Sequence, residues 1–467
     1  MKRRSAVRQL HYKNCLSRIV IKLRGNLALP SQQLEEAIDL SLINSNLQID
    51  KLFTSVTKKK ISELVDRAKQ SDSTYQPPNF FSYYAISGID EKSPGVLLER
   101  FLRHEAVELA YAETAPTYPP SGNSTNRVGK YQGYLDPAPM GINARYAWTV
   151  KGGDGKGKVK FIDIEQGWLM DHESLTVNSV PGTGLNHHLF EDHGAGVLGI
   201  IMMKGTRTGV GITSKVKGYV VSQWRPDGSF NDADAIMTAI CLLDFGDILL
   251  LESQTPDSFS SDRVWPVEIQ EATYQVIRLA TALGIVVIEA GGNGNSNETE
   301  GNDLDLFMIN RKKILDPDDE DFRDSGAVIV AAASSNIPHT RVHYSNYGKR
   351  INCYAWGENV FTAGNHPRSS GWAINMYNED FAGTSSASAI VAGVAIAVQN
   401  IAEMNYQFRF APKEMREILS SDKYGTASKN GSLIDKIGVM PDLKKIIDRK
   451  LQAKKISKHI RNKSSHL

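Results

Sequence analysis

The sequence has little of what marks disulfide-rich or nucleic-acid-binding proteins. Its 467 residues include only three cysteines, Cys15, Cys241 and Cys353, which are far apart and odd in number. They form neither a metal-binding motif nor a disulfide framework, as expected in a reducing compartment. The formal net charge is only +2, so there is no global electrostatic case for a nucleic-acid or anionic-membrane partner.

Long apolar runs are also missing. No stretch of about 18 or more apolar residues occurs, which argues against a membrane-spanning helix. The basic N-terminus is not followed by an apolar stretch, so it does not have the pattern of a secretory signal. We therefore expect a cytoplasmic protein without a membrane partner, with leaderless export as the alternative.

Strand and helix patterns alternate through the first quarter of the chain. The predicted strands are residues 18–23, 52–56, 80–86 and 107–112, and the predicted helices are residues 31–43, 59–68 and 94–101. This pattern indicates a small α+β domain of ferredoxin-like type over residues 1–113. A linker follows over residues 114–140, and its first part is dense in proline, glycine and polar residues.

A larger domain is predicted over residues 141–442. Short apolar strands alternate there with helices, as in a parallel sheet that is covered on both faces. The predicted strands are residues 159–163, 216–222, 248–252, 285–290 and 327–333, and helices are predicted at residues 193–203, 232–243 and 266–283. The fold class is therefore α/β with a doubly wound, mostly parallel sheet. The remaining residues, 443–467, form a basic tail that is best explained as a solvated terminus, with nucleic-acid binding as the weaker alternative.

One stretch of small residues, 381–393, indicates chemistry. A turn at Gly383 and Thr384 leads into the apolar run 389–398, which predicts a buried helix that begins near Ser385. A serine at that place meets unpaired backbone N–H groups and the positive end of the helix dipole. These favour the negative charge that develops during acyl transfer. Taken alone, simple helix capping explains the stretch equally well.

Three other polar residues stand where strands end or helices begin. Asp163 ends a predicted strand, His193 opens a predicted helix, and Asn293 follows another strand. Functional groups in open α/β sheets gather at the carboxyl ends of the strands. Each residue has an ordinary structural explanation by itself, but together with Ser385 they indicate an assembled site.

In chain order these residues are Asp163, His193, Asn293 and Ser385. This order resembles that of the subtilisin-like serine proteases. The segment around Asp163 is similar to that family's strand-Asp-x-Gly pattern, and the segment around His193 to its His-Gly-x-x-Val-x-Gly pattern. Gly383-Thr-Ser-Ser-Ala-Ser388 matches the family's serine box. The likeness covers roughly residues 140–442 and implies a subtilisin-like fold and a serine endopeptidase.

The resemblance also implies a role for each residue. Ser385 attacks the peptide carbonyl and His193 transfers the proton, while Asp163 orients the imidazole. The side chain of Asn293 and the Ser385 N–H bind the oxyanion. No cofactor is expected. The loop 203–209 carries positive charge and no carboxylate where many relatives hold calcium, so no metal is expected either.

The resemblance gives the N-terminal domain a function too. It looks like the propeptide of such proteases, an intramolecular chaperone and inhibitor, with residues 113–120 lying through the cleft; a separate binding domain is the alternative. Glu252, Ser253 and Gln254 stand where the family has a substrate-binding edge that pairs with an extended peptide. The acidic segment 296–324 is best explained as a solvated surface insertion, and the alternative is that Glu252 and this segment favour basic residues in the substrate.

The sequence thus predicts a polypeptide substrate and hydrolysis through an acyl-enzyme. Two alternatives stay open. A peptide ligase or cyclase would use the same triad, because an acyl-enzyme can react with an amine. A catalytically silent pseudoprotease would only bind peptides, although a binding module needs none of the four residues.

Overall fold

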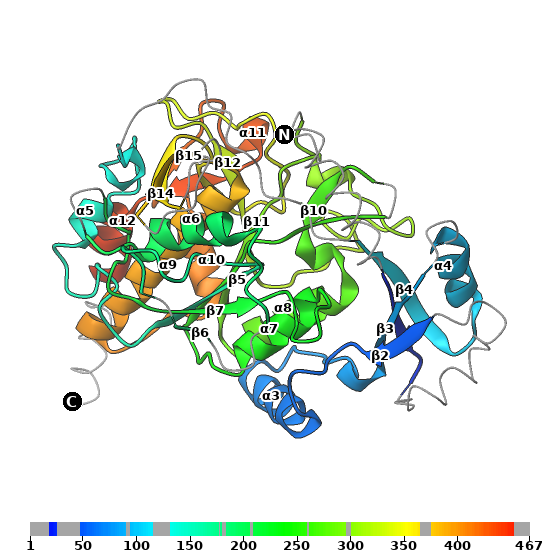
Figure 1. The fold of residues 1–467 in the computed structure, drawn as a ribbon. Coiled ribbons are helices and arrows are strands. Elements are labelled where there is room, and N and C mark those ends of the chain that lie inside the picture. Colours follow the sequence, from blue (N-terminus) through cyan, green and yellow to red (C-terminus); the bar gives the residue numbers. More distant parts are fainter. Residues whose placement is uncertain are drawn as a thin grey trace, which may run out of the picture.

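The computed structural model describes residues 18–452, apart from residues 26–46, 90–93, 115–130, 177, 180–183, 206–208, 259–260, 296–299 and 365–374. The predicted helix at 31–43, most of the predicted linker and the tail beyond residue 452 lie outside the described residues. The described chain forms a small N-terminal sheet beside a much larger sheet (Figure 1).

The N-terminal sheet has four antiparallel strands in the order β2-β3-β1-β4. Its elements are β1 (Arg18–Leu23), β2 (Gln48–Lys51), α3 (Lys58–Ser71), β3 (Tyr83–Ser87), α4 (Pro94–Arg103) and β4 (Val107–Glu113). The prediction of a strand at 52–56 is wrong, because the strand ends at Lys51. Beyond it, Thr54 and Ser55 turn their N–H groups to Asp234 of the large domain, at 3.0 and 3.2 Å, instead of to a strand.

The large sheet has nine strands in the order β16-β17-β13-β12-β11-β8-β5-β7-β6. They are β5 (Lys160–Glu165), β6 (Asn178–Ser179), β7 (Lys217–Ser222), β8 (Ile248–Leu251), β11 (Val286–Ala290), β12 (Val328–Ala333), β13 (Cys353–Trp356), β16 (Gly425–Ala427) and β17 (Val439–Pro441). All neighbours are parallel except β16 and β17. The prediction of a mostly parallel sheet is confirmed.

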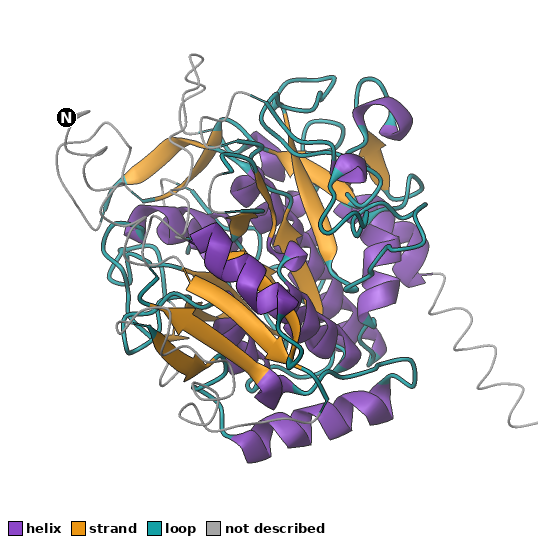
Figure 2. Ribbon diagram, turned by 90° about the vertical axis from the view of Figure 1, so that its right-hand side faces the viewer, coloured by secondary structure: helices purple, strands orange, loops and turns teal. Residues whose placement is uncertain are grey.

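Helices cover both faces of this sheet (Figure 1, Figure 2). One apolar cluster joins one face to α6 (Glu191–Met202) and α9 (Thr384–Tyr406), and a second joins the other face to α7 (Asp232–Ile240) and α8 (Glu271–Ala282). The fold is therefore doubly wound, as predicted. Shorter elements complete it: α5 (Ala144–Ala147), β9 (Gln254–Pro256), β10 (Val264–Pro266), β14 (Val360–Ala363), β15 (Tyr377–Phe381), α10 (Pro412–Leu419), α11 (Ser432–Asp435) and α12 (Leu443–Lys445).

Helix α9 is the central helix of the large domain. It is long and apolar enough to cross a membrane, but its most apolar part is entirely buried inside the protein. Its early residues are small, which lets it pack closely against α6 and the sheet. Burial of this kind is that of a core helix, and it fixes the start of α9 firmly at the carboxyl edge of the sheet.

The N-terminal domain docks on the outer side of α7 and α8 (Figure 1). Leu52, Ile61 and Leu64 share one apolar cluster with side chains of these two helices. Two ion pairs flank this cluster. Arg225 pairs with Asp234 at 3.0 Å, beneath the loop that holds Ser55, and Asp72 of the N-terminal domain pairs with Arg278 at 2.6 Å.

Candidate active site

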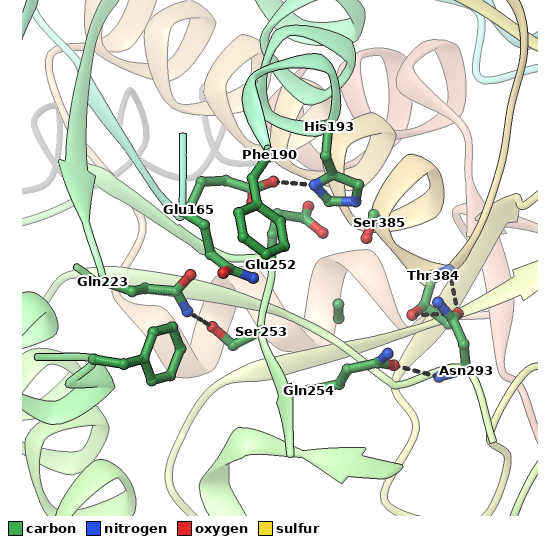
Figure 3. A pocket seen from close by; sticks show the side chains of 13 residues that line it. Glu165, Phe190, His193, Gln223, Glu252, Ser253, Gln254, Asn293, Thr384 and Ser385 are labelled. Atoms are coloured by element: carbon green, nitrogen blue, oxygen red, sulfur yellow. Dashed lines mark hydrogen bonds and ion pairs between the residues drawn. The ribbon is translucent and has the colours of Figure 1, made fainter. Parts of the chain in front are cut away.

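The candidate site lies where the strand order of the large sheet reverses. The chain places β7 on one side of β5 and β8 on the other, and such a switch point opens a crevice at the carboxyl ends of the strands. A pocket occupies this crevice (Figure 3). Its lining residues are Glu165, Gln166, Phe190, His193, Gln223, Phe230, Glu252, Ser253, Gln254, Ala290, Asn293, Thr384 and Ser385.

Ser385 is the second residue of α9. The helix is preceded by Gly383, whose φ of 100° is in the region that favours glycine. The first backbone N–H groups of a helix have no intrahelical acceptor, so the Ser385 N–H and the helix dipole both face the pocket. The Ser385 side chain is only 5 % exposed and lies beside the imidazole of His193 (Figure 3).

His193 stands in the first turn of α6. Its Nδ1 donates to Glu165 Oε1 at 2.5 Å, which fixes the tautomer with the proton on Nδ1. Its Nε2 is buried and has no hydrogen-bond partner among the described residues. The imidazole therefore presents an unused lone pair to the pocket in which Ser385 lies.

The acid that binds His193 is Glu165, so the prediction that Asp163 orients this imidazole is wrong. Both residues belong to β5 and lie on the same face, because side chains of a strand alternate. Glu165 is the last residue of the strand and reaches the crevice. Asp163 lies one step deeper, where it is fully buried and accepts a hydrogen bond from Trp168 Nε1 at 2.8 Å.

The sequence held a signal for Glu165 that the prediction missed. In the acid-x-Gly pattern the glycine stands two residues after the acid, and Gly167 has this spacing from Glu165, not from Asp163. The glycine is needed because a Cβ at Gly167 would come within 2.4 Å of the backbone oxygen of His187. A Cβ at Gly194 would in turn come within 2.2 Å of the Gly167 oxygen. Two glycines thus bring the strand end and the start of α6 into contact.

Asp163 adds a second carboxyl group behind Glu165. Burial raises the pKa of Asp163 well above its usual range, and the charge of Glu165 raises it further. The hydrogen bond from Trp168 opposes this rise. Asp163 Oδ1 has no hydrogen-bond partner among the described side chains and backbone. These conditions favour the protonated form of Asp163.

Asn293 follows β11 and joins the start of α9. Its Oδ1 accepts hydrogen bonds from Thr384, from the backbone N at 2.9 Å and from Oγ1 at 3.0 Å. Its own backbone N donates to Gln254 Oε1 at 2.8 Å. Because Oδ1 is occupied by donors, the amide nitrogen is the part of the side chain that can donate to a ligand in the pocket. The structure thus brings Asn293 and Ser385 together, as the sequence suggested.

The predicted substrate-binding residues follow β8, and they line the same pocket. Ser253 Oγ donates to Asp232 Oδ1 at 3.1 Å and accepts from Gln223. Gln254 begins β9 and holds Asn293. Glu252 Oε1 and Ser388 Oγ are hydrogen-bonded to each other at 2.6 Å. The three side chains therefore form the part of the pocket wall next to β8, and hydrogen bonds to neighbouring elements hold them in place.

Asp232 marks the junction between the pocket and the N-terminal domain. Its pKa is raised to about 6, chiefly by burial and also by the charge of Glu113 at the end of β4, while the hydrogen bonds from Gln223 and Ser253 oppose the rise. Glu113 is paired with Arg18 at 2.5 Å. Thr114 and Glu113 line a second pocket with Asp232 and Gln254, so the end of β4 lies next to the crevice.

Most described carboxylates of the acidic segment that follows Asn293 are paired with lysine or arginine. The ion pairs join Asp303 and Asp305 to Lys436, Asp316 and Asp318 to Lys349, Asp321 to Lys312, and Asp324 to Arg416. These pairs compensate part of the negative charge of the segment. Over the described part of the chain, no group of three or more metal-binding side chains is placed to hold an ion.

A buried serine at a helix start, an imidazole held by a carboxylate and an amide donor are the groups that serine hydrolases use. A sequence model of the Subtilase family matches residues 165–439, more than half of the chain. The chain belongs to this family, which is one of serine peptidases.

Two solved structures are similar in fold. Fervidolysin from Fervidobacterium pennivorans, a keratinolytic enzyme related to subtilisin, has a TM-score of 0.51 and 14% identity over 92% of this chain and 60% of its own. The prenylagaramide maturation protease PagA has a TM-score of 0.46 and 16% identity over 65% of this chain and 97% of its own. A search of curated proteins finds no match. At these identities the likeness concerns the fold.

Proposed function

We propose that the chain is a serine endopeptidase that uses Ser385, His193 and Glu165 as its catalytic triad. The observation that carries this proposal is the state of the imidazole. Nδ1 is bound to Glu165 at 2.5 Å, while Nε2 is buried without a partner in the pocket that Ser385 lines. An imidazole held in this way is ready to accept a proton at Nε2.

The chemistry follows from this arrangement. Ser385 Oγ attacks the peptide carbonyl while its proton passes to His193 Nε2, and Glu165 stabilises the resulting imidazolium. The imidazolium then protonates the leaving amine, and the acyl-enzyme is hydrolysed by water in the same way. The Asn293 amide and the Ser385 N–H stabilise the oxyanion, as donors fixed before the charge develops. No step needs a cofactor.

The substrate is a polypeptide that enters the crevice in extended form along residues 252–254. The backbone there follows β8 at an open end of the sheet, and strand addition is how extended peptides bind such an edge. Glu113 and Thr114 approach the same region from the N-terminal domain. This supports residues 1–113 as an intramolecular inhibitor and chaperone of the catalytic domain. The catalytic domain extends beyond the predicted bounds 141–442, into the predicted linker 114–140 and tail 443–467, because its apolar core includes Tyr134, Leu135, Leu443, Ile446 and Leu451.

The test is labelling of the full chain with a fluorescent fluorophosphonate, followed by a denaturing gel. We expect wild type to be labelled and Ser385→Ala to be unlabelled. Ser386→Ala is the matched control, because Ser386 Oγ is turned away to Trp356 O at 2.9 Å and does not line the pocket. Absence of labelling in wild type, even after proteolysis between residues 114 and 140, would favour a silent peptide-binding protein.

Product analysis separates hydrolysis from ligation. Mass spectrometry of a cleaved peptide with an added amine nucleophile shows whether the acyl group passes to water or to the amine. We expect the free acid as the main product. A dominant ligated or cyclic product would replace the hydrolase by a peptide ligase that uses the same triad.

A further inference from the structure

The strongest unexplained feature of the pocket is Glu252, a third carboxyl group that the triad does not use. Its Oε1 is bonded to Ser388 on α9, and its Oε2 is buried without a hydrogen-bond partner among the described residues. Ser388 lies on α9, less than one turn after Ser385. Glu252 therefore links the end of β8 to the helix turn that carries the nucleophile.

We propose that Glu252 is a neutral carboxylic acid in the resting site, that it positions Ser385 through Ser388, and that its ionisation limits the reaction at alkaline pH. The positioning role and the alkaline limit rest on the proposed function. The protonation state does not, and it can be measured in a protein without activity.

The hydrogen bonds around Ser388 give the first argument. A hydroxyl has one proton to donate, yet Ser388 Oγ has three acceptors nearby: Glu252 Oε1 at 2.6 Å, Thr384 O at 2.8 Å and Ser385 O at 3.0 Å. If Glu252 is protonated, it donates to Ser388 Oγ and the hydroxyl proton satisfies Thr384 O. If Glu252 is ionised, the hydroxyl must choose between the carboxylate and the helix carbonyl. Only the neutral acid satisfies both contacts.

The charges around the pocket give the second argument. Glu165 and Asp163 of β5 lie close enough to act on Glu252. The other titratable groups at this pocket are His193 of α6 and, behind Ser253, Asp232 of α7. No lysine or arginine is among the residues that line it. The single positive charge that the site can form, the His193 imidazolium, is already bound to Glu165 at 2.5 Å.

The direction of the pKa agrees with both arguments. Burial raises the pKa of Glu252 well above its usual range, and the charge of Glu165 raises it further. The hydroxyls of Ser388 and Ser385 oppose the rise. A buried carboxyl group without a counter-charge keeps its proton rather than its charge.

Ionisation of Glu252 has a direct consequence for the reaction. A negative charge beside Ser385 repels the oxyanion that forms on the bound carbonyl, and a water-excluded pocket screens this repulsion weakly. The rate therefore falls once Glu252 has lost its proton.

Infrared spectroscopy tests the protonation state directly. We expect the difference spectrum of wild type minus Glu252→Gln, recorded on the full chain at neutral pH, to contain the carbonyl stretch of a protonated carboxyl group. Asp163→Asn is the matched control, and it should remove a separate band. A difference spectrum that shows a lost carboxylate band instead would overturn the proposal, whether or not the protein cleaves peptides.

Kinetics test the positioning role and the alkaline limit. We expect kcat/KM of wild type to fall at alkaline pH, and this fall to disappear in Glu252→Gln, which still donates to Ser388. Glu252→Ala should lower kcat by about tenfold, because the link to α9 is lost, while Glu252→Gln retains more activity. Equal losses in both variants, or an unchanged alkaline fall in Glu252→Gln, would overturn this part. If wild type cleaves nothing but the infrared band is present, the proposed function fails and the neutral Glu252 stands.

Discussion

Buried carboxyl groups at the docking surface of the N-terminal domain and at the pocket differ in how they are paired. At the docking surface, Asp234 is fully buried but is bonded to Arg225, Thr54 and Ser55. At the site, Glu252 in the pocket lining and Asp163 behind Glu165 each have an oxygen without a hydrogen-bond partner among the described residues, and no lysine or arginine lines the pocket. Complete compensation is what a structural role requires. Incomplete compensation at a crevice is typical of groups tuned for chemistry.

One more buried acid, Glu268, can be compared with these. Glu268 lies behind the sheet, away from the pocket, where it binds Arg350 through both oxygens at 2.8 and 2.9 Å. Ser325 donates to the same carboxylate at 2.5 Å. Glu268 is thus compensated by an arginine, whereas no lysine or arginine lines the pocket at the carboxyl ends of β5 and β8.

The largest expected effect separates the two acids of β5. Glu165→Gln should lower kcat/KM by roughly 10⁴-fold, because the imidazole loses the charge that fixes its tautomer and stabilises the imidazolium. Asp163→Asn, two residues away, should lower it by less than about tenfold, since Asp163 does not bind His193. Steady-state kinetics on a peptide substrate measure both. The reverse order would restore Asp163 as the triad acid.

The next effect concerns stability at the docking surface. Arg225→Met should lower the free energy of unfolding by about 3 kcal/mol, because it leaves the Asp234 carboxylate buried without its counter-charge. Denaturant unfolding followed by fluorescence gives the value. The double variant with Asp234→Asn should recover part of the loss, and failure to recover any would mean that the ion pair is not what Arg225 contributes.

Asp232 predicts a pH dependence of stability with a defined sign. Its pKa is raised by burial from 3.8 to about 6 in the folded chain. The unfolded chain therefore loses this proton first, so the contribution of Asp232 is full below about pH 4 and falls as the pH rises to about 6. The loss amounts to about 3 kcal/mol at most.

Asp232→Asn checks this sign, since an amide cannot ionise. Measured between pH 4 and pH 7, the stability of wild type relative to Asp232→Asn should decrease as the pH rises. A relative stability that increases over this range would show that Asp232 is ionised and compensated, like the acids of the docking surface.

The smallest effect is expected at the surface. Arg416 binds both oxygens of Asp324, at 2.6 and 2.7 Å, and this pair holds the pKa of Asp324 below its usual range. Because Asp324 is partly exposed to solvent, Arg416→Ala should cost only about 0.5 to 1 kcal/mol in unfolding free energy. Added salt should reduce this cost, while the Arg225 effect should hardly change.

The central strands could be predicted from the sequence because each is a continuous apolar run. The predicted strand 216–222 and the observed strand Lys217–Ser222, for example, differ by one residue. Short strands such as β9 and β14 escaped prediction, since their pairing depends on partners far along the chain. The prediction of a strand at 52–56 failed for a related reason. Leu52 is buried in a loop against the large domain rather than in a strand.

The site residues also divide into those with a local signal in the sequence and those that depend on distant contacts. Ser385, His193 and Asn293 could be found because each begins or follows a regular element. The spacing to Gly167 distinguishes Glu165 from Asp163 in the sequence, but the contact of Glu165 with His193 is set by where α6 starts over β5. The contact between Glu252 and Ser388 joins elements 136 residues apart. Such a contact leaves no local trace in the sequence.

The position of α9 late in the chain has a consequence for synthesis. Glu165 and His193 leave the ribosome well before Ser385, and the helix that carries Ser385 can be buried only after the strands around it exist. The last strand, β17, pairs with β13, and Asp442 just beyond it binds Asn143 at 2.8 Å, near the start of the large domain. A growing chain therefore holds only an incomplete site until nearly the whole large domain has been made.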